Sequence, residues 1–569
     1  MHFLENIFAR LKTAGDELVL QEIHPERVES VSGNELLALV ERAQSFIAGV
    51  GLKQGDRCAL LGPNSIRWIA VDLALMAEGV IVVPLYSRQA AAELVTMMKD
   101  CAPARLFCST PALRDSIAAA WPGAPPATLF DEFLASSAES GSTSLTDVQP
   151  IRFAGSSSAE LAPLPITIIY TSGTSGEPKG VVLNVGNLDH MMSCTTRRLD
   201  RLMEMHPRLA RREQIFHYLP LNFAASWLTM LSALSRNSVF SLSTDLNRLA
   251  DEIKIARPDY LLNVPTLLER IRARIEGQLA ERGRAISGLF NCAKAAFART
   301  QSGAPKASDG LWLALGNAIL FRTIRRAIGP NLKALICGSA PLAVETQRFF
   351  MMLGIPVLQA YGLTETTGIC TLDDPQHFTP GFVGPAIPGI EMCVGENSEI
   401  LVRGPNIFPG YWQRPEATAK ALEGGWFHTG DQGEVNAAGN WRIIGRVKNL
   451  IILNSGHNIA PEPIEEELKK LVPAADHVVL VGNNRSYLAA IFSSGAGSAN
   501  GLYAAQAQDA LDRVNQSLPH YRQIRAFCVS TVPFSIENGL LTANGKLKRD
   551  VITERLREAI EELYRKKAL

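Results

Sequence analysis

An apolar run that stops abruptly at a loop of hydroxyls and glycines constrains this chain more than any other feature. Residues 165–170 are predicted to form a buried strand, which continues into Thr171-Ser-Gly-Thr-Ser-Gly-Glu-Pro-Lys179-Gly. Glycines allow a tight turn whose successive backbone N–H groups point into one concavity, and Lys179 adds a mobile positive charge. These groups suit a polyphosphate, although the spacing is not that of the common nucleotide loop. A solvated Ser/Gly loop is the alternative interpretation.

Composition narrows the class of protein. A chain of 569 residues exceeds a typical single domain, so we expect two or more domains. Lys and Arg together number 56, as do Asp and Glu, which gives no electrostatic argument for nucleic-acid binding. Basic clusters at residues 208–212 and 322–326 are interpreted as solvated helix faces. The nine cysteines are scattered without a Cys-x-x-Cys pair, which is typical of a reducing compartment and predicts no zinc site.

The N-terminus and the hydropathy pattern predict a cytoplasmic protein. Residues 1–12 form an amphipathic helical pattern that lacks the apolar core and cleavage site of a signal peptide. No apolar run is long enough to span a bilayer. Loose attachment to a membrane surface stays open as an alternative.

The hydrophobic pattern of the first third predicts a parallel sheet. Residues 56–62 and 79–84 are short apolar strands separated by an apolar helix at 64–76, and the same rhythm returns at 104–109. Strand, helix and strand at this spacing form a crossover unit of an α/β fold. Residues 136–158, rich in serine, are predicted to be a surface linker before the hydroxyl-rich loop.

A second polar cluster, Gln359-Ala-Tyr-Gly-Leu-Thr-Glu-Thr366, combines the groups that a nucleotide needs. Tyr361 offers a flat face for adenine, and Thr364 offers a hydroxyl to a phosphate. Glu365 offers a hard carboxylate for Mg²⁺, which proteins bind through one or two carboxylates and phosphate oxygens. An ordinary turn is the alternative interpretation.

Four further clusters also combine polar groups with glycines or breaks between strands. A predicted strand at 332–337 ends in Gly338, Ser339 and Ala340, where the backbone can approach a flat ring without obstruction. Asp431 follows a glycine turn, although an Asp-containing hairpin would look similar. Arg446-Val-Lys448 is a charged break between two apolar strands, and Lys546 lies in Leu541-Thr-Ala-Asn-Gly-Lys-Leu-Lys-Arg549.

Together these motifs, in this order, resemble those of the adenylate-forming superfamily, which includes acyl-CoA synthetases, aryl-CoA ligases, firefly luciferase and peptide-synthetase adenylation domains. The segment at 61–86 also resembles the N-terminal part of fatty acyl-CoA synthetases. The resemblance implies an α/β fold with a large N-terminal domain of several subdomains, residues 1–446, in which parallel sheets are flanked by helices. It implies a small mobile α+β C-terminal domain, residues 447–569, with a hinge near Lys448.

The resemblance also implies roles for individual residues. Catalysis would fall to Lys546, Thr364 and Glu365, with Glu365 holding the metal. The acyl pocket would be lined by Phe223, where the synthetases usually have histidine, and by Trp227, Val264 and Gly338, although plain core is an equal alternative for the aromatic residues. Nucleotide and CoA binding would involve Thr171, Ser172, Gly173, Thr174, Ser175, Gly176, Lys179, Gly338, Ser339, Ala340, Gln359, Ala360, Tyr361, Gly362, Thr364, Asp431, Arg446, Lys546, Gly456 and His457.

The implied reaction has two steps, in which ATP activates a carboxylic acid to acyl-AMP and CoA then takes the acyl group. Segments 219–234, 260–265 and 336–341 hold no obvious charged group, which favours a medium- or long-chain fatty acid over an amino acid.

Only a short turn at 373–380 stands where acyl-AMP ligases carry an insertion, which favours CoA as acceptor. Transfer to a carrier protein, β-lactone synthesis and a non-catalytic nucleotide-binding protein are the alternatives. ATP, Mg²⁺ and CoA are the expected cofactors, for a monomer or homodimer.

Overall fold

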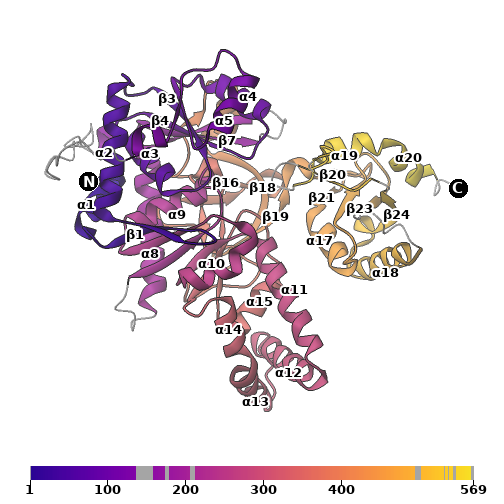
Figure 1. The fold of residues 1–569 in the computed structure, drawn as a ribbon. Helices are drawn as coiled ribbons and strands as arrows, with labels where there is room; N and C mark the ends of the chain where they lie inside the picture. The colour runs from indigo at the N-terminus through magenta and orange to yellow at the C-terminus, as the bar shows by residue number, and fades with distance from the viewer. Residues whose placement is uncertain are drawn as a thin grey trace. The chain divides into compact units, whose positions relative to one another are not determined.

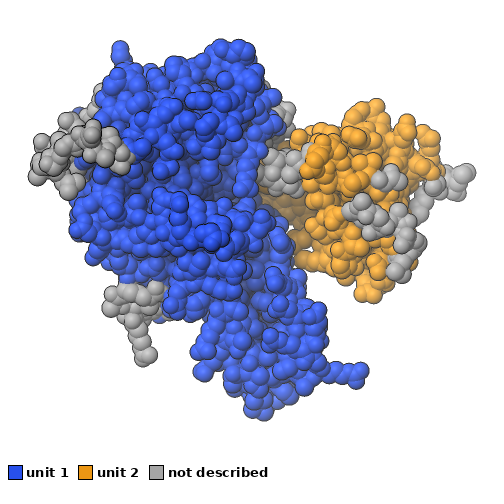
Figure 2. All heavy atoms as spheres, viewed as in Figure 1, with its two compact units in different colours: residues 1–392, 402–427, 435–441 blue, residues 393–401, 428–434, 442–569 orange. Residues whose placement is uncertain are grey.

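The computed structural model describes residues 2–135, 158–172, 178–205, 212–493, 501–530, 532–535, 537–541 and 546–565. The chain divides into two compact units, whose elements are drawn in Figure 1 and whose extents are coloured in Figure 2. Unit 1 comprises residues 1–392, 402–427 and 435–441, and unit 2 comprises residues 393–401, 428–434 and 442–569. The hinge near Lys448 and the boundary at 446/447 remain predictions.

The first sheet of unit 1 carries the hydroxyl-rich loop. Its strand order is β17-β8-β7-β4-β3-β5-β6. Strands β3 and β4 run parallel and are joined by helix α3, and β5 runs parallel to β3, so the predicted crossover unit and its repeat are confirmed. The bounds are β3 Arg57–Gly62, α3 Ile66–Ala77, β4 Ile81–Tyr86, β5 Arg105–Cys108, β6 Ala127–Leu129, β7 Pro165–Ser172, β8 Pro178–Asn184 and β17 Gly410–Tyr411.

The second sheet of unit 1 has eight strands in the order β14-β13-β12-β11-β9-β10-β1-β2. Its six central strands pair in parallel, and the two edge strands, β14 and β2, pair antiparallel. The bounds are β1 Leu18–Ile23, β2 Val28–Ser32, β9 Glu213–His217, β10 Ser238–Ser243, β11 Tyr260–Asn263, β12 Ala334–Cys337, β13 Val357–Tyr361 and β14 Thr371–Leu372.

The N-terminal amphipathic helix belongs to the core. Helix α1, Phe3–Ala14, buries its apolar face, including Ile7 and Leu11, and contacts α2 (Gly33–Gly49), α8 (Val185–Glu204) and α9 (Ala224–Leu234). This packing buries the apolar face that, from the sequence alone, could also have bound a membrane surface. Among the described residues, no helix combines the length and the apolar character needed to cross a bilayer.

A group of helices extends from the second sheet between β11 and β12. It consists of α11 (Pro265–Glu281), α12 (Arg284–Gln301), α13 (Asp309–Gly316), the π-helical turn η2 (Asn317–Phe321) and α14 (Arg322–Ile328). The sequence of residues 280–309 predicts a polar helical excursion, and helix α12 in this range confirms it. In Figure 1, α12 and α13 lie at the end of unit 1 away from both sheets. Phe290, Leu320 and Phe321 attach the group to the core of the sheet.

A four-stranded sheet in the order β15-β16-β18-β19 carries Asp431 and Arg446. Its strands are β15 Glu391–Val394, β16 Glu399–Arg403, β18 Phe427–Val435 and β19 Trp441–Arg446, and their residues are shared between the two units.

The remainder of unit 2 is the α+β region that the sequence predicts. Its sheet, β22-β23-β24, is covered by α17 (Glu462–Leu471), α18 (Gly501–Ser517), α19 (Arg549–Arg555) and α20 (Arg557–Arg565). The strands are β22 His477–Val481, β23 Leu488–Ser493 and β24 Ile524–Ser530, and a short ladder joins β20 (Ile451–Ile452) to β21 (Asn458–Ile459).

The structure corrects two details of this region. The sequence predicts one helix at 545–564, in which Arg557 pairs with Glu561. The structure has two helices here, because Leu556 leaves helical geometry with φ −102° and ψ 18°. Arg557 pairs with Glu554 and not with Glu561, which instead pairs with Arg485. The linker predicted at 136–158 lies outside the described residues, except that helix α7 (Ser158–Leu161) begins at its last position.

Candidate active site

Lys179 lies at the start of β8, directly across from the end of β7. The two strands form an antiparallel hairpin in which Thr171 pairs with Lys179 and Ser172 with Pro178. The tip of the hairpin, with Gly173, Thr174, Ser175 and Gly176, lies outside the described residues. The hairpin therefore fixes where the lysine emerges from the sheet.

Glu365 and Lys179 meet at one aromatic ring, that of Tyr411 on β17. The Tyr411 hydroxyl donates to Oε1 of Glu365 at 2.9 Å, and the Nζ atom of Lys179 lies 5.2 Å from the ring centroid. Burial and the charge of Glu365 raise the pKa of the Tyr411 hydroxyl, so it stays a donor. The Glu365 carboxylate and the Lys179 ammonium therefore both contact the side chain of Tyr411.

Glycines in the two motifs allow neighbouring backbone segments to approach closely. A Cβ atom on Gly180 would lie 2.7 Å from Cγ2 of Ile168, and one on Gly362 would lie 2.4 Å from Cα of Ile369. Neither position has room for a side chain. The glycines in the two motifs are therefore required by packing, in addition to any contact with a ligand.

The segments predicted to face adenine lie at the ends of neighbouring parallel strands, β12 and β13. Ser339 has φ +72°, a left-handed conformation that a non-glycine residue rarely adopts, and it is exposed together with Ala340. Tyr361 and Thr364 are half-buried, at the end of β13 and in the turn after it. Such outliers at strand ends are typical of ligand sites.

Gln359 differs from its neighbours because its side chain is used inside the protein. It is 4% exposed, and its Nε2 donates to Oε1 of Gln347 at 3.0 Å and to the carbonyl oxygen of Phe382 at 2.9 Å. Its backbone N–H donates to Asp373. These bonds give Gln359 a structural role, and Ala360, next to it, is also buried.

The residues predicted to line the acyl pocket have different environments. Phe223 and Val264 are half-buried, and the Phe223 ring lies 6.4 Å from that of Tyr86. Trp227 is 1% exposed and its indole N–H donates to Oδ2 of Asp72 at 2.8 Å, so it belongs to the core. A pocket wall in this region would consist of the half-buried residues.

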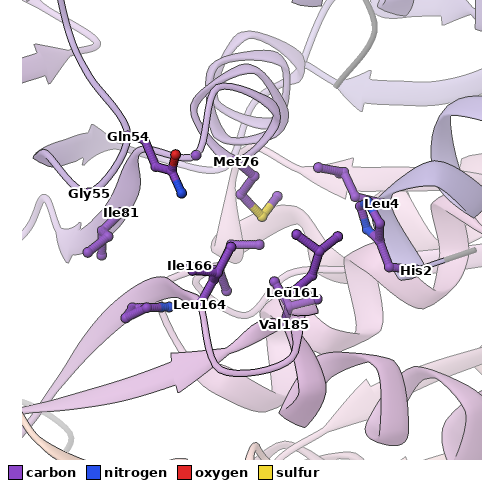
Figure 3. A pocket seen from close by; sticks show the side chains of 12 residues that line it. His2, Leu4, Gln54, Gly55, Met76, Ile81, Leu161, Leu164, Ile166 and Val185 are labelled. Atoms are coloured by element: carbon purple, nitrogen blue, oxygen red, sulfur yellow. The ribbon is translucent and has the colours of Figure 1, made fainter. Parts of the chain in front are cut away.

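A small, partly open cavity of unit 1 is lined by none of these residues. It has a volume of about 70 Å³ and an apolar lining that includes Leu4, Met76, Ile81 and Ile166 (Figure 3). Ligand pockets for small molecules are usually several hundred Å³. The cavity is a packing void between α1, α3 and the start of β7, and no predicted site residue lines it.

Unit 2 brings three other predicted residues together. Asp431, 4% exposed, accepts a bond from Nε of Arg446 at 2.6 Å. The Lys546 side chain is exposed overall, but protein atoms surround its charged end. This desolvation and the charge of Arg446 lower the pKa of Lys546, and the charge of Asp431 opposes the shift. Desolvation and Arg446 also lower the pKa of Lys448. An anion bound here would relieve the repulsion among these cations.

Gly456 and His457 form an exposed turn in unit 2. Gly456 has φ +81°, and the His457 ring stacks on Tyr521 with centroids 4.2 Å apart. Ser455 Oγ lies 2.9 Å from His457 Nδ1. The stacked pair fixes the ring at the surface.

Sequence reasoning missed Tyr411 and Asp72. The aromatic residues in Phe408-Pro-Gly-Tyr411-Trp412 were a usable signal for Tyr411, since few surface loops carry three. Asp72 is the one carboxylate in the apolar helix α3, which marks it as a residue with a special environment.

Comparison with known proteins establishes the family. Residues 8–412 match the AMP-binding enzyme family, and residues 448–568 match the AMP-binding enzyme C-terminal domain. The chain therefore belongs to the AMP-binding enzymes of the adenylate-forming superfamily, which are AMP-forming ligases. The predicted family and α/β fold class are confirmed.

Several relatives match almost the whole chain. The long-chain-fatty-acid–CoA ligase FadD15 of Mycobacterium tuberculosis is 27% identical over 98% of this chain and 96% of its own length. Long chain acyl-CoA synthetase 3 of Arabidopsis thaliana is 26% identical over 94% of this chain and 86% of its own. Among solved structures, ATP-bound MatB from Rhodopseudomonas palustris has the same fold, with a TM-score of 0.70 at 23% identity over 98% of this chain and all of that one.

Proposed function

We propose that this enzyme uses ATP to activate a medium- or long-chain fatty acid to acyl-AMP and then transfers the acyl group to CoA. The observation that carries the proposal is the Lys179–Tyr411–Glu365 contact, which joins two family motifs 186 positions apart in the sequence at one polar site. The names of the relatives support a fatty acid as substrate and CoA as acceptor.

The first step requires electrostatic help, because a carboxylate must attack the α-phosphorus of ATP and both reactants are anions. In the proposed mechanism, Lys179 binds the phosphates and Lys546 offsets the charge that develops as pyrophosphate leaves. Preorganised cations in a site that excludes water supply much of such stabilisation. Asp431 would accept hydrogen bonds from the ribose hydroxyls, with Arg446 orienting its carboxylate.

Glu365 fits a magnesium site. It is 9% exposed, and the Tyr411 hydroxyl holds one of its oxygens in place, which leaves a carboxylate of fixed orientation beside Thr364. Mg²⁺ bound there would neutralise phosphate charge. The residues of this chain that would hold the ion are Glu365 and, through its hydroxyl, Thr364.

In the second step the CoA thiol attacks the carbonyl carbon of acyl-AMP, and AMP leaves. Lys546 has no task in this step, because no pyrophosphate is released. We propose that rotation about the backbone near Lys448 removes Lys546 and brings the turn of Gly456 and His457 to the CoA chain. Such a motion is a gating step of the kind that often limits turnover.

A panel of carboxylic acids tests the proposal. We expect acid-dependent exchange of labelled pyrophosphate into ATP with medium- or long-chain fatty acids, and AMP release that requires CoA. Exchange without CoA-dependent AMP release would instead indicate transfer to a carrier protein, and AMP release with a 3-hydroxy acid alone would indicate β-lactone synthesis. Absence of exchange with every acid would contradict the proposed reaction.

Tyr411→Phe tests how Glu365 is held. The variant keeps the ring beside Lys179 and loses the hydroxyl that donates to Glu365. Partners that orient a metal-binding carboxylate typically contribute about 10- to 100-fold in metal affinity. We expect pyrophosphate exchange to need about tenfold more Mg²⁺, with the KM for the fatty acid unchanged. Tyr487→Phe, which loses a hydroxyl in unit 2, is the matched control and should behave as wild type.

A further inference from the structure

The helices that follow α11, between β11 and β12, are strongly cationic. The chain as a whole is neutral, with 56 cationic and 56 anionic side chains. Residues 282–344 have a single carboxylate, Asp309, which is 2% exposed and paired with Arg299. The nine cations of this segment are Arg282, Arg284, Lys294, Arg299, Lys306, Arg322, Arg325, Arg326 and Lys333.

An apolar row runs along one face of the same helices. Leu311, Leu315 and Ile319 are 60%, 37% and 52% exposed, although most large aliphatic side chains of this protein are buried. They are spaced four residues apart on α13 and η2, which places them on one side of the helix. Ala314 and Ala318, both exposed, lie between them. The opposite side of the helix packs into the core through Leu320 and Phe321.

The row continues into a basic row at the same helical spacing. Arg322 and Arg326 follow Ile319 on α14, and both are exposed. Arg325 points elsewhere, because it donates to the Leu353 carbonyl oxygen at 2.6 Å and to Asn317 at 3.0 Å. Within the described part of the chain, no ion pair or hydrogen bond is recorded for Arg322 or Arg326. One continuous face is therefore apolar at one end and cationic at the other.

From this pattern we propose that the face of α13, η2 and α14 docks on the surface of an anionic lipid bilayer. Helices that lie on membranes bury an apolar face in the boundary of the acyl chains and use Lys and Arg to contact anionic headgroups. The aliphatic row would enter the bilayer, and the arginines would reach the headgroups. Leucine and isoleucine side chains suit the acyl chains of a lipid better than a protein partner, whose interfaces are enriched in aromatic groups.

This inference is independent of the proposed reaction, since it concerns a surface outside all the predicted site residues. For that reaction, the surface would bring the enzyme to the bilayer in which long-chain acids dissolve. It also revises the interpretation of the basic cluster at 322–326 as a merely solvated helix face. The amphipathic N-terminal helix, by contrast, has its apolar face in the core.

Co-sedimentation of the full chain with vesicles tests the proposal. We expect binding to phosphatidylcholine vesicles that contain phosphatidylglycerol, weaker binding to phosphatidylcholine alone, and loss of the difference at high salt. Leu311→Glu/Ile319→Glu should bind about a hundredfold more weakly. Arg322→Gln/Arg326→Gln should bind the anionic vesicles about thirtyfold more weakly, because each contact of an arginine with an anionic surface contributes about fivefold.

Two controls separate this surface from general effects. Val28→Glu/Val435→Glu places the same two charges on exposed aliphatic residues outside these helices, and Lys12→Gln/Lys53→Gln removes two charges elsewhere. Both should bind as wild type, and all variants should keep the wild-type melting temperature. Wild-type protein that ignores both vesicles, or a Leu311→Glu/Ile319→Glu variant that binds normally, would overturn the proposal. The docking proposal would also be overturned if this face bound an acidic protein instead of lipid, or if the variants lost self-association instead of vesicle binding.

The same variants distinguish this inference from the proposed reaction. Pyrophosphate exchange with a short, water-soluble acid needs no membrane, so the exchange rate should not change in any of them. A protein that binds vesicles but exchanges no pyrophosphate refutes only the reaction. A protein that is active but does not bind vesicles refutes only the docking surface.

Discussion

Lys546→Ala is expected to lose the adenylation step and to keep the thioester step. The Lys546 ammonium interacts electrostatically with Arg446 and Asp431 in unit 2, and desolvation together with the charge of Arg446 lowers its pKa, so that a bound anion would favour its charged form. Removing one preorganised cation from a phosphate site costs about 3–4 kcal/mol, which is about a hundred- to a thousandfold in rate. Pyrophosphate exchange should fall by this factor, whereas supplied acyl-AMP and CoA should yield thioester at close to the wild-type rate.

Lys548→Ala is the control for this experiment. Lys548 is an exposed lysine two residues further on, so it tests whether a general loss of positive charge in the segment matters. Its exchange rate should stay within about threefold of wild type, as for an exposed charge that makes no specific contact. Equal loss of both half-reactions in Lys546→Ala would contradict the assigned role and would indicate damage to the fold of unit 2.

The sequence predicted the parts of the site that depend on local chemistry. Lys179 at the end of a buried strand and Glu365 in its polar cluster are both recognisable because glycines and hydroxyls surround them. Their meeting at Tyr411 was not predictable, because β17 joins β8 through long-range pairing, in which Tyr411 lies opposite Val181, 230 positions away. A residue that links two motifs across such a distance leaves no periodic signal in either.

Where the local sequence pattern gave a wrong or incomplete interpretation, tertiary packing explains the difference. Residues 1–12 look like a membrane-surface helix in isolation, yet Leu4 and Ile7 are buried against other helices. Trp227 looked like a pocket wall, but its indole N–H has a buried carboxylate partner. Strand β24 was missed because its alternation of apolar and polar residues is weak, and its position beside β23 gives it a strand partner that its own sequence does not indicate. Amphipathicity predicts that a face will be covered, but it does not identify what covers it.

Asp72→Asn is expected to stabilise unit 1 at alkaline pH and to change little at acidic pH. Asp72 is fully buried in α3, where Trp227 donates to Oδ2 and Oδ1 has no partner. Desolvation raises the pKa of this carboxyl from 3.8 to about 7, and the bond from Trp227 opposes the rise only in part. Because the folded pKa lies above the unfolded one, the folded state holds the proton more tightly. Folding stability therefore falls as pH rises from about 4 to about 7.

The size of the effect follows from the shift of about three pKa units, which corresponds to on the order of 4 kcal/mol as an upper limit. Asparagine cannot ionise and keeps an oxygen that accepts the bond from Trp227, so the variant should lack this pH dependence. We expect its melting temperature to match wild type at about pH 3.5, where both states hold the proton, and to exceed it by several degrees near pH 8. Asp115→Asn, at an exposed position, should show no such difference. A constant difference between Asp72→Asn and wild type across this range would show that folding does not raise the pKa of Asp72. A lower melting temperature of the variant at pH 8 would show that the charged form stabilises the contact of α3 with α9.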